Sequence, residues 1–221
     1  MSSSAQVIPS GARRVSHVQA SKILASRSPA MAGLVAVCGP MKLEASGISH
    51  FASLVRSIVH QQLAGSAASA IHARLHAALQ GAVSPETIAA TGRDVLRSAG
   101  LSNAKAASIC DLAEKVLDGT VDLEPRRIGR MTDEVVVADL CKVKGIGVWT
   151  AQMFLLFQLR RFDVWPVGDL GVRRGYGLAF GVEAPSPREL EDLGDQFRPY
   201  RSVAAWYCWR ATEVLSSRRK P

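Results

Sequence analysis

The sequence has only four cysteines among its 221 residues, and they lie far apart. No CxxC pair or tight cluster joins Cys38, Cys110, Cys141 and Cys208, so the sequence predicts neither a zinc site nor an iron–sulfur site. Scattered thiols of this kind are typical of small core residues in a reducing cytosol. We therefore expect a cytoplasmic protein with no metal site built from cysteine.

Long apolar runs are missing as well. No stretch reaches the roughly 18 consecutive apolar residues of a membrane-spanning helix, so we expect no contact with a membrane. The first residues, MSSSAQVIPSGARR, lack the apolar segment of a secretory signal. Their small and polar composition predicts a disordered tail over residues 1–15, and we expect a folded domain over residues 16–216 and a basic tail over residues 217–221.

Acidic residues are missing from both ends of the chain. Five basic residues and no acidic one precede Glu44, and three basic residues and no acidic one follow Glu213. The net charge of +8 therefore comes from the ends, since residues 44–213 hold 19 basic and 19 acidic groups. Global basicity is thus weak support for a nucleic-acid partner, whereas segment 142–174 carries a local net charge of +4.

Strand-like alternation is also missing, and apolar residues recur at helical spacing instead. Leu54 and Ile58 share one face of a helix expected from Phe51 to Gln62. Ser66 is expected to cap the next helix. Further helix starts are predicted by the capping residues Ser84, Ser102, Thr132 and Ser186. The sequence therefore predicts an all-α fold.

Residues 140–157 are the most informative part of the chain. A helix is predicted to end near Cys141, a Gly-x-Gly turn follows, and a new apolar helix begins at about Val148. The turn contains two glycines, Gly145 and Gly147, and two lysines lie just before it, Lys142 and Lys144. The glycines permit a tight turn whose outward-facing amides suit phosphate, and the lysines add positive charge. The alternative is a tight helix–helix turn that binds nothing.

The motif K-G-I-G-x-W-T-A in this hairpin resembles that of the helix-hairpin-helix DNA glycosylases, most closely the alkylation-repair branch typified by bacterial 3-methyladenine DNA glycosylase II. Residues 163–174 resemble the segment around that family's conserved aspartate, and residues 199–209 resemble its C-terminal helix. Upstream, residues 58–63 resemble its minor-groove probe, and residues 101–105 the start of a middle helix. The likeness extends, in order, over roughly residues 20–215.

The resemblance implies a two-lobed helical fold with the active site in a cleft between the lobes. It implies a monofunctional glycosylase of base excision repair, which flips an alkylated purine (3-methyladenine, 7-methylguanine) out of damaged double-stranded DNA and hydrolyses its glycosidic bond. The chain would be a compact, bacterial-type form without the N-terminal β-rich domain of the archetype. We expect a monomer without a cofactor, although hairpins of this type also bind a monovalent cation through their carbonyls.

Asp169 is the residue that the resemblance makes catalytic, because it lies 20 residues after Trp149, as the family's aspartate does. Cleavage of an N-glycosidic bond builds positive charge on the sugar, which a nearby carboxylate stabilises. The alternative is a carboxylate that only stabilises the N-terminus of the next helix. Relatives that also cut the DNA backbone carry a Schiff-base lysine at the position of Trp149, which cannot form an imine. The resemblance thus implies base release without lyase activity.

Aromatic residues are expected to form the pocket for the flipped base. Trp209 lies eight residues after Arg201, which matches the family's spacing for the stacking aromatic, and Trp206 is the alternative one turn earlier. An electron-rich indole attracts a cationic methylated purine through cation–π contact. Trp149 and Met153 are expected to line the same pocket. For each of these side chains, packing in the core is the alternative.

Leu63 is expected to be the wedge that fills the gap left by the flipped nucleotide, and Gln62 to hydrogen-bond the widowed partner base. The alternative for Leu63 is an ordinary buried leucine at a helix end. Arg173 is expected to contact phosphate, with a solvated surface position as the alternative. His60, next to the wedge, has no chemical task in this scheme.

Two rival functions stay open at this point. A non-catalytic helix-hairpin-helix DNA-binding protein would use the hairpin without needing Asp169 or Trp209. A glycosylase for other damaged or mismatched bases would share Asp169, but such relatives usually carry the lysine or a four-cysteine cluster.

Overall fold

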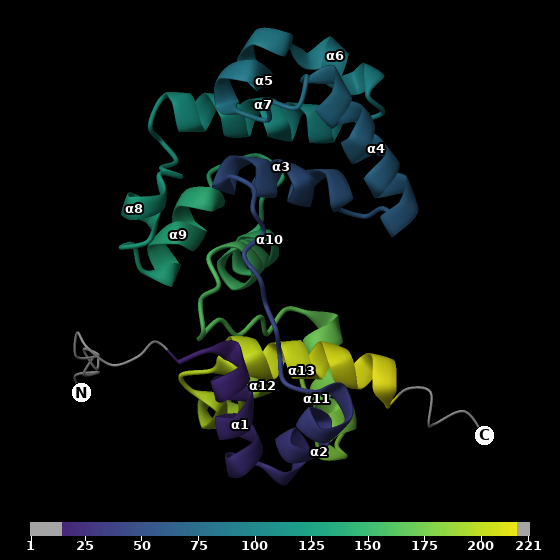
Figure 1. The fold of residues 1–221 in the computed structure, drawn as a ribbon, viewed down its shortest axis with the longest axis vertical. Helices are drawn as coiled ribbons and strands as arrows, with labels where there is room; N and C mark the ends of the chain where they lie inside the picture. The colour runs from purple at the N-terminus through teal and green to yellow at the C-terminus, as the bar shows by residue number, and fades with distance from the viewer. Residues whose placement is uncertain (1–14, 216–221) are drawn as a thin grey trace. The chain divides into compact units, whose positions relative to one another are not determined.

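The computed structural model describes residues 15–215. They form two compact units, coloured by position in the chain in Figure 1. The central unit is Leu43–Leu170, and the terminal unit combines residues 15–42 with residues 171–215. All regular elements of the described residues are helical, which confirms the predicted all-α fold.

Two predictions concern the ends of the chain and membranes. The predicted tails, residues 1–15 and 217–221, lie outside the described part of the chain, apart from Val15. Within the described part, no helix combines the length and the apolar character needed to cross a bilayer.

The terminal unit is built around its last helix, α13. Its helices are α1 (His17–Arg27), α2 (Pro29–Cys38), α11 (Leu170–Phe180), α12 (Pro187–Leu193) and α13 (Arg201–Val214), with a 3-10 turn at Asp195–Phe197. α13 packs against α1 and α2, and the Tyr207 hydroxyl donates to Gly39 O over 2.9 Å and accepts from Met41 N over 3.2 Å. α11 lies close to α13, because a Cβ on Gly175 would collide with the Cys208 carbonyl.

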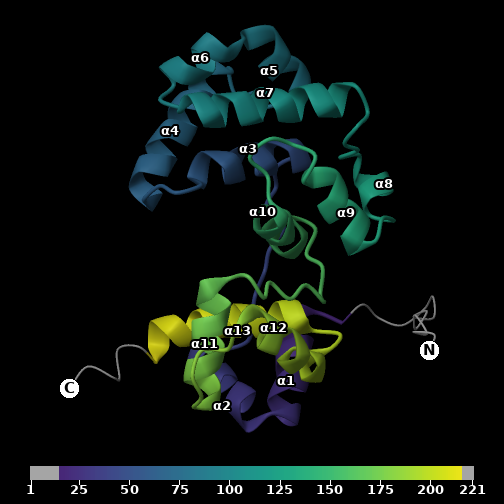
Figure 2. The same ribbon diagram turned by 180° about the vertical axis from the view of Figure 1, so that it is seen from behind.

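The central unit has its core where α3 and α7 pack with the chain that follows the hairpin. Its helices are α3 (His50–His60), α4 (Gly65–Ala78), α5 (Pro85–Thr91), α6 (Arg93–Ser98), α7 (Asn103–Leu117), α8 (Pro125–Ile128), α9 (Asp133–Leu140) and α10 (Val148–Met153). α7 packs against α3, α5 and α6 (Figure 2). Buried side chains of this core include Leu54, Ile58, Ile109, Leu112 and Phe154.

Most helix starts follow the predicted capping residues. Side-chain oxygens accept the expected amide hydrogen bonds at Ser84, Ser102, Thr132 and Ser186. The prediction for Ser66 is wrong, because α4 begins at Gly65 and its N-cap is Ala64, which has no side-chain acceptor. The turn after α3 already brings Ala64 into an extended conformation, so the helix begins before Ser66 is reached.

The helix after the hairpin is less regular than its sequence suggests. α10 continues into a π-helical turn, Phe154–Gln158, in which Leu159 N donates to Phe154 O over 3.0 Å. Such wide turns are rare and often mark functional sites. This one buries three consecutive side chains, Phe154, Leu155 and Leu156. It thus anchors the far end of the hairpin helix in the core of the central unit.

Candidate active site

Asp169, the predicted catalytic carboxylate, lies in a tight turn directly before α11. Its backbone N–H closes the turn by donating to Pro166 O over 2.9 Å. The residue is only 9% exposed, so its charge acts through a less polarisable medium than bulk water. This position agrees with a carboxylate at a helix start and with a buried anion able to oppose a developing cation.

Trp149 is a partner of this carboxylate. Its indole Nε1 donates a hydrogen bond to Asp169 Oδ2 over 2.7 Å. The ring is 49% exposed, so the alternative of an ordinary core tryptophan is wrong. A short hydrogen bond to an ionised acceptor is strong and directional, so Trp149 orients the carboxylate. Met153, one turn further on, is half-buried at the end of α10.

The hairpin turn requires glycine at one position and leaves open space at the other. Gly145 has a φ of +79°, and a Cβ there would collide with Ser108 Oγ on α7. Gly147 is the N-cap of α10, and a Cβ there would meet nothing within 4 Å. The backbone is therefore packed on α7 at Gly145 and accessible at Gly147, as the predicted phosphate site requires.

The two hairpin lysines carry exposed charges, each near a carboxylate. Lys142 Nζ lies 2.7 Å from Asp139 Oδ1, in a surface pair of little energetic weight. The side chain of Lys144 is 77% exposed, while its backbone N–H donates to Asp111 Oδ2 over 2.8 Å. Burial raises the pKa of Asp111, but the Lys144 amide and the Lys115 ammonium together outweigh it and hold the pKa below its usual range. Asp111 therefore supports the turn as a carboxylate.

The predicted wedge lies in the turn between α3 and α4. Leu63 is 39% exposed, so the alternative of a buried leucine is wrong. Gln62 has a φ of +55°, a left-handed conformation that costs a residue with a Cβ on the order of 1 kcal/mol. Gln61 Nε2 donates to Gly145 O over 3.0 Å and approaches Thr150 Oγ1 at 3.4 Å. The structure thus brings the wedge turn and the hairpin together.

Three predicted site residues belong to the terminal unit. Trp206 and Trp209 lie on α13 and are half-buried. The Trp206 ring meets the Tyr207 ring edge-on, with centroids 4.9 Å apart, and the Arg210 guanidinium lies 5.8 Å from its centroid. Arg173 Nε donates over 2.6 Å to a backbone carbonyl in the loop before α12. Packing thus already engages Trp206 and Arg173, and the roles of all three toward DNA stay predictions.

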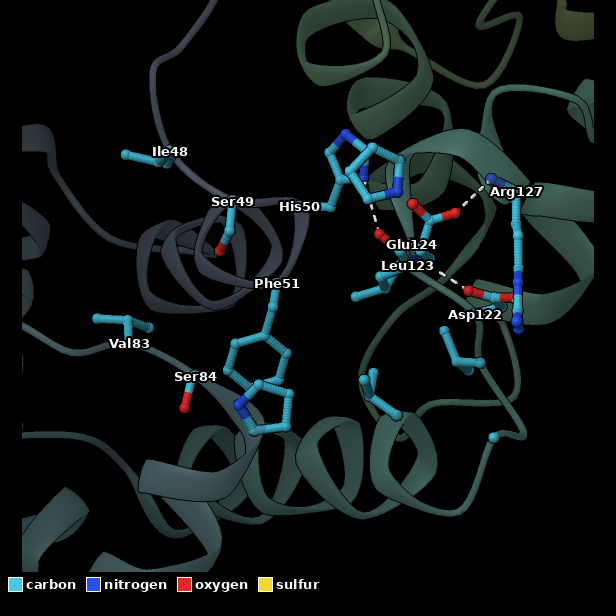
Figure 3. A pocket seen from close by; sticks show the side chains of 15 residues that line it. Ile48, Ser49, His50, Phe51, Val83, Ser84, Asp122, Leu123, Glu124 and Arg127 are labelled. Carbon is cyan, nitrogen blue, oxygen red and sulfur yellow. Dashed lines mark hydrogen bonds and ion pairs between the residues drawn. The ribbon is translucent and has the colours of Figure 1, made fainter.

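A cavity of about 550 Å³ lies at the N-terminal end of α3, away from the wedge (Figure 3). The Phe51 side chain lines it, and His50 Nδ1 lies 3.0 Å from Leu123 O at its wall. At its rim the Arg127 guanidinium donates to Asp122 Oδ2 over 3.2 Å. Neither Asp169 and Trp149 nor the hairpin and wedge residues line this cavity.

The sequence analysis did not predict the residues that hold the hairpin turn and the wedge turn in place. These are Lys105, Ser108 and Asp111 on α7, together with Gln61 on the wedge turn. A signal was present, because the three α7 residues recur every third position and so share one helix face. His60 Nδ1 lies 2.9 Å from the Arg56 carbonyl on the same helix.

Comparison with known protein sequences identifies the family of the chain. The profile of the family described as HhH-GPD superfamily base excision DNA repair protein matches residues 55–199. DNA-3-methyladenine glycosylase 1 of Schizosaccharomyces pombe is 32% identical over 174 residues, which is 77% of this chain and 75% of that protein.

Solved structures of two 3-methyladenine DNA glycosylases are also similar to the chain. The 3-methyladenine DNA glycosylase of Schizosaccharomyces pombe in complex with abasic DNA matches with a TM-score of 0.78 and 29% identity, over 89% of this chain and 97% of that one. The DNA-3-methyladenine glycosidase of Bacillus halodurans matches with a TM-score of 0.80 and 32% identity, over 90% and 91%. The chain belongs to the HhH-GPD superfamily of base excision DNA repair proteins.

Proposed function

We propose that this protein is a monofunctional DNA glycosylase that removes alkylated purines of the 3-methyladenine and 7-methylguanine class from damaged duplex DNA. The observation that carries the proposal is the buried Asp169 carboxylate, which Trp149 Nε1 orients over 2.7 Å. The names of the similar proteins support the substrate class, since they are DNA-3-methyladenine glycosylases. Base excision repair is the process in which such an activity serves.

Cleavage of the glycosidic bond of an alkylated purine requires mainly an anion close to the sugar. Alkylation at a ring nitrogen gives the purine a positive charge, so it leaves without a strong general acid. The bond between C1′ and the purine nitrogen breaks, its electron pair goes to the purine, and positive charge grows on the sugar. Asp169 stabilises that charge, and a water oxygen then bonds to C1′ and releases a proton. The products are the free base and an abasic site.

Lyase chemistry is not part of the proposal. It would need an amine that attacks C1′, and Trp149 stands where such relatives carry their lysine. Lys142 and Lys144 precede the turn, and the side chains of both point to a carboxylate or to solvent. Borohydride should therefore trap no covalent protein–DNA adduct. The abasic product should stay intact until heat or alkali is applied.

The DNA is held, in this proposal, by the hairpin and opened by the wedge. The amides around Gly147 and the exposed Lys144 contact phosphate and position the enzyme without reading sequence. Leu63 enters the base stack and Gln62 faces the widowed base. A monomer is sufficient for these contacts, and a cytoplasmic location stays a prediction. No cofactor is invoked, and a monovalent cation at the hairpin stays a prediction.

The test is Asp169→Asn, a near-isosteric change that removes the charge opposing the sugar cation. We expect single-turnover release of 3-methyladenine to fall by at least about 10²-fold, with binding to damaged duplex nearly intact. Asp94→Asn, an exposed position on α6, is the matched control and should release base at the wild-type rate. Wild-type turnover by Asp169→Asn would show that another group is catalytic.

A panel of duplexes with methylated, etheno-substituted, oxidised and mismatched bases tests the substrate class. Release of methylated purines well above the others is the expected result. A preference for oxidised or mismatched bases would move the protein to the rival glycosylase class. Duplex binding without any base release would favour the non-catalytic DNA-binding alternative.

A further inference from the structure

The turn that carries the wedge residue Leu63 lacks the left-handed glycine with which many helices end. Instead, α3 is followed by Gln62 in that conformation. The two backbone hydrogen bonds that close the turn, donated by Gln61 N and Leu63 N, are both long, at 3.4 Å. The turn therefore depends on support from outside α3.

Lys105 supplies that support from α7. Its Nζ donates to Val59 O over 2.8 Å and to Gln61 O over 2.7 Å. An ammonium group at a helix C-terminus satisfies carbonyls that lack helical partners and opposes the negative end of the helix dipole. Partial burial lowers the pKa of Lys105, and the two hydrogen bonds offset that loss of solvent.

The same face of α7 also supports the hairpin. Asp111 accepts the Lys144 amide over 2.8 Å, and Ser108 lies beside Gly145, where a Cβ would collide with the Ser108 Oγ. Lys105 and Asp111 are six residues apart, so about 9 Å of helix separates the two supports. One rigid helix thus sets the spacing between the wedge turn and the hairpin turn.

Gln61 connects the wedge turn directly to the hairpin. Its carbonyl is held by Lys105, while its Nε2 donates to Gly145 O over 3.0 Å. A shift of the α3 end would therefore break a contact with α7 and a contact with the hairpin. The wedge residues that follow, Gln62 and Leu63, are exposed.

We propose that Lys105 is a positioning residue for base flipping, which holds the wedge turn at a fixed distance from the hairpin. The inference rests on the proposed function and deepens it. Because its ammonium engages the wedge turn rather than the carboxylate site, Lys105 matters when a nucleotide must leave a paired duplex. It matters little when the lesion is already unpaired.

The test places one alkylated lesion in two settings, a fully paired duplex and a mismatched bubble. Lys105→Met keeps the length of the side chain and loses its donors, whereas Lys105→Arg keeps charge and donors. We expect Lys105→Met to slow single-turnover base release from the paired duplex roughly tenfold and from the bubble less than about twofold. Lys105→Arg should recover most of the rate. Arg97→Met, which removes an exposed positive charge from the same unit, should leave both rates unchanged.

A double variant separates positioning from general support of the fold. If Lys105 acts through the wedge, Lys105→Met adds little to the loss caused by Leu63→Ala. Additive losses, or equal slowing on paired and bubble substrates, would overturn the proposal. If circular dichroism shows that Lys105→Met does not fold, Gln61→Leu carries the same comparison, because it removes the bridge to Gly145 O. A wild-type protein that releases no alkylated base from either substrate would instead overturn the proposed function.

Discussion

The hairpin turn and the wedge turn are in direct contact in the central unit, yet they are built in opposite ways. Each contains a left-handed residue, which in the hairpin is Gly145, beside Ser108 of α7, and in the wedge turn is Gln62, which carries a full side chain. A buried carboxylate, Asp111, holds an amide of the hairpin. A half-buried ammonium, Lys105, binds the carbonyl of Val59 at the end of α3 and the carbonyl of Gln61 in the wedge turn.

The difference separates stability from function. The hairpin uses the residue that its backbone requires, so its geometry costs little and tolerates little change. The wedge turn keeps two side chains at its tip at the cost of a strained backbone, as is common at functional sites. We therefore expect hairpin substitutions to lower the free energy of unfolding and wedge substitutions to act mainly on base flipping.

Of the substitutions that test this comparison, Gly145→Val should have the largest effect on the free energy of unfolding. Valine is strained at a φ of +79° and its Cβ would collide with Ser108, so we expect the free energy of unfolding to fall by about 3 kcal/mol. Affinity for damaged and undamaged duplex should fall together, because the turn is forced out of shape. Gly147→Ala is the control, since its backbone conformation suits alanine and the space beside it is open. Equal denaturant midpoints for the two variants would show that the turn is not packed as described.

The contrast between the turns also explains what the sequence could predict. Gly-x-Gly, the capping serines and Asp169 carry local signals, because each residue type meets a demand of its own backbone or of the chemistry. Lys105 and Asp111 act on segments that lie 33 to 46 residues away, and no local pattern names their partners. The bond between Trp149 and Asp169 was missed for the same reason, although both residues were assigned to the site.

Two features of the local structure, the start of α4 and the turn after α10, were not predicted from the sequence. The sequence predicts Ser66 as the N-cap of α4, but the helix begins at Gly65, after a turn that contains the left-handed Gln62. Glutamine rarely adopts this conformation, so the sequence does not indicate where the turn ends. The π-helical turn at Phe154–Gln158 buries three consecutive apolar side chains, Phe154, Leu155 and Leu156, and no local pattern in the sequence predicts such a turn. Local sequence patterns therefore predicted the helices, but not the exact residues at which α4 begins and α10 ends.

Asp111→Asn should have the second largest effect, again on the hairpin side. Removal of the charge leaves the Lys115 ammonium, 3.0 Å away, without its carboxylate, so we expect a loss of about 2 kcal/mol at neutral pH. The folded-state pKa of Asp111 is lowered, so its contribution to stability is present above the unfolded pKa of about 3.9 and is lost as pH falls through the folded pKa. The difference between wild type and variant should therefore shrink in acid. A difference that stays constant between roughly pH 2 and pH 6 would assign the loss to packing rather than to charge.

Gln62→Gly should have the smallest effect on stability, and it tests the wedge side directly. Glycine relieves a left-handed conformation that costs about 1 kcal/mol, but it also loses more conformational entropy on folding, by roughly 0.5–1 kcal/mol. The two terms nearly cancel, so the free energy of unfolding should change by less than about 1 kcal/mol. Gln62→Ala is the matched variant, because it removes the same amide and keeps the Cβ. If the amide hydrogen-bonds the widowed base, both variants should slow release from a paired duplex to the same extent and leave release from a bubble unchanged. If only Gln62→Ala were slow, the backbone conformation of the turn, and not the glutamine side chain, would be what the wedge requires.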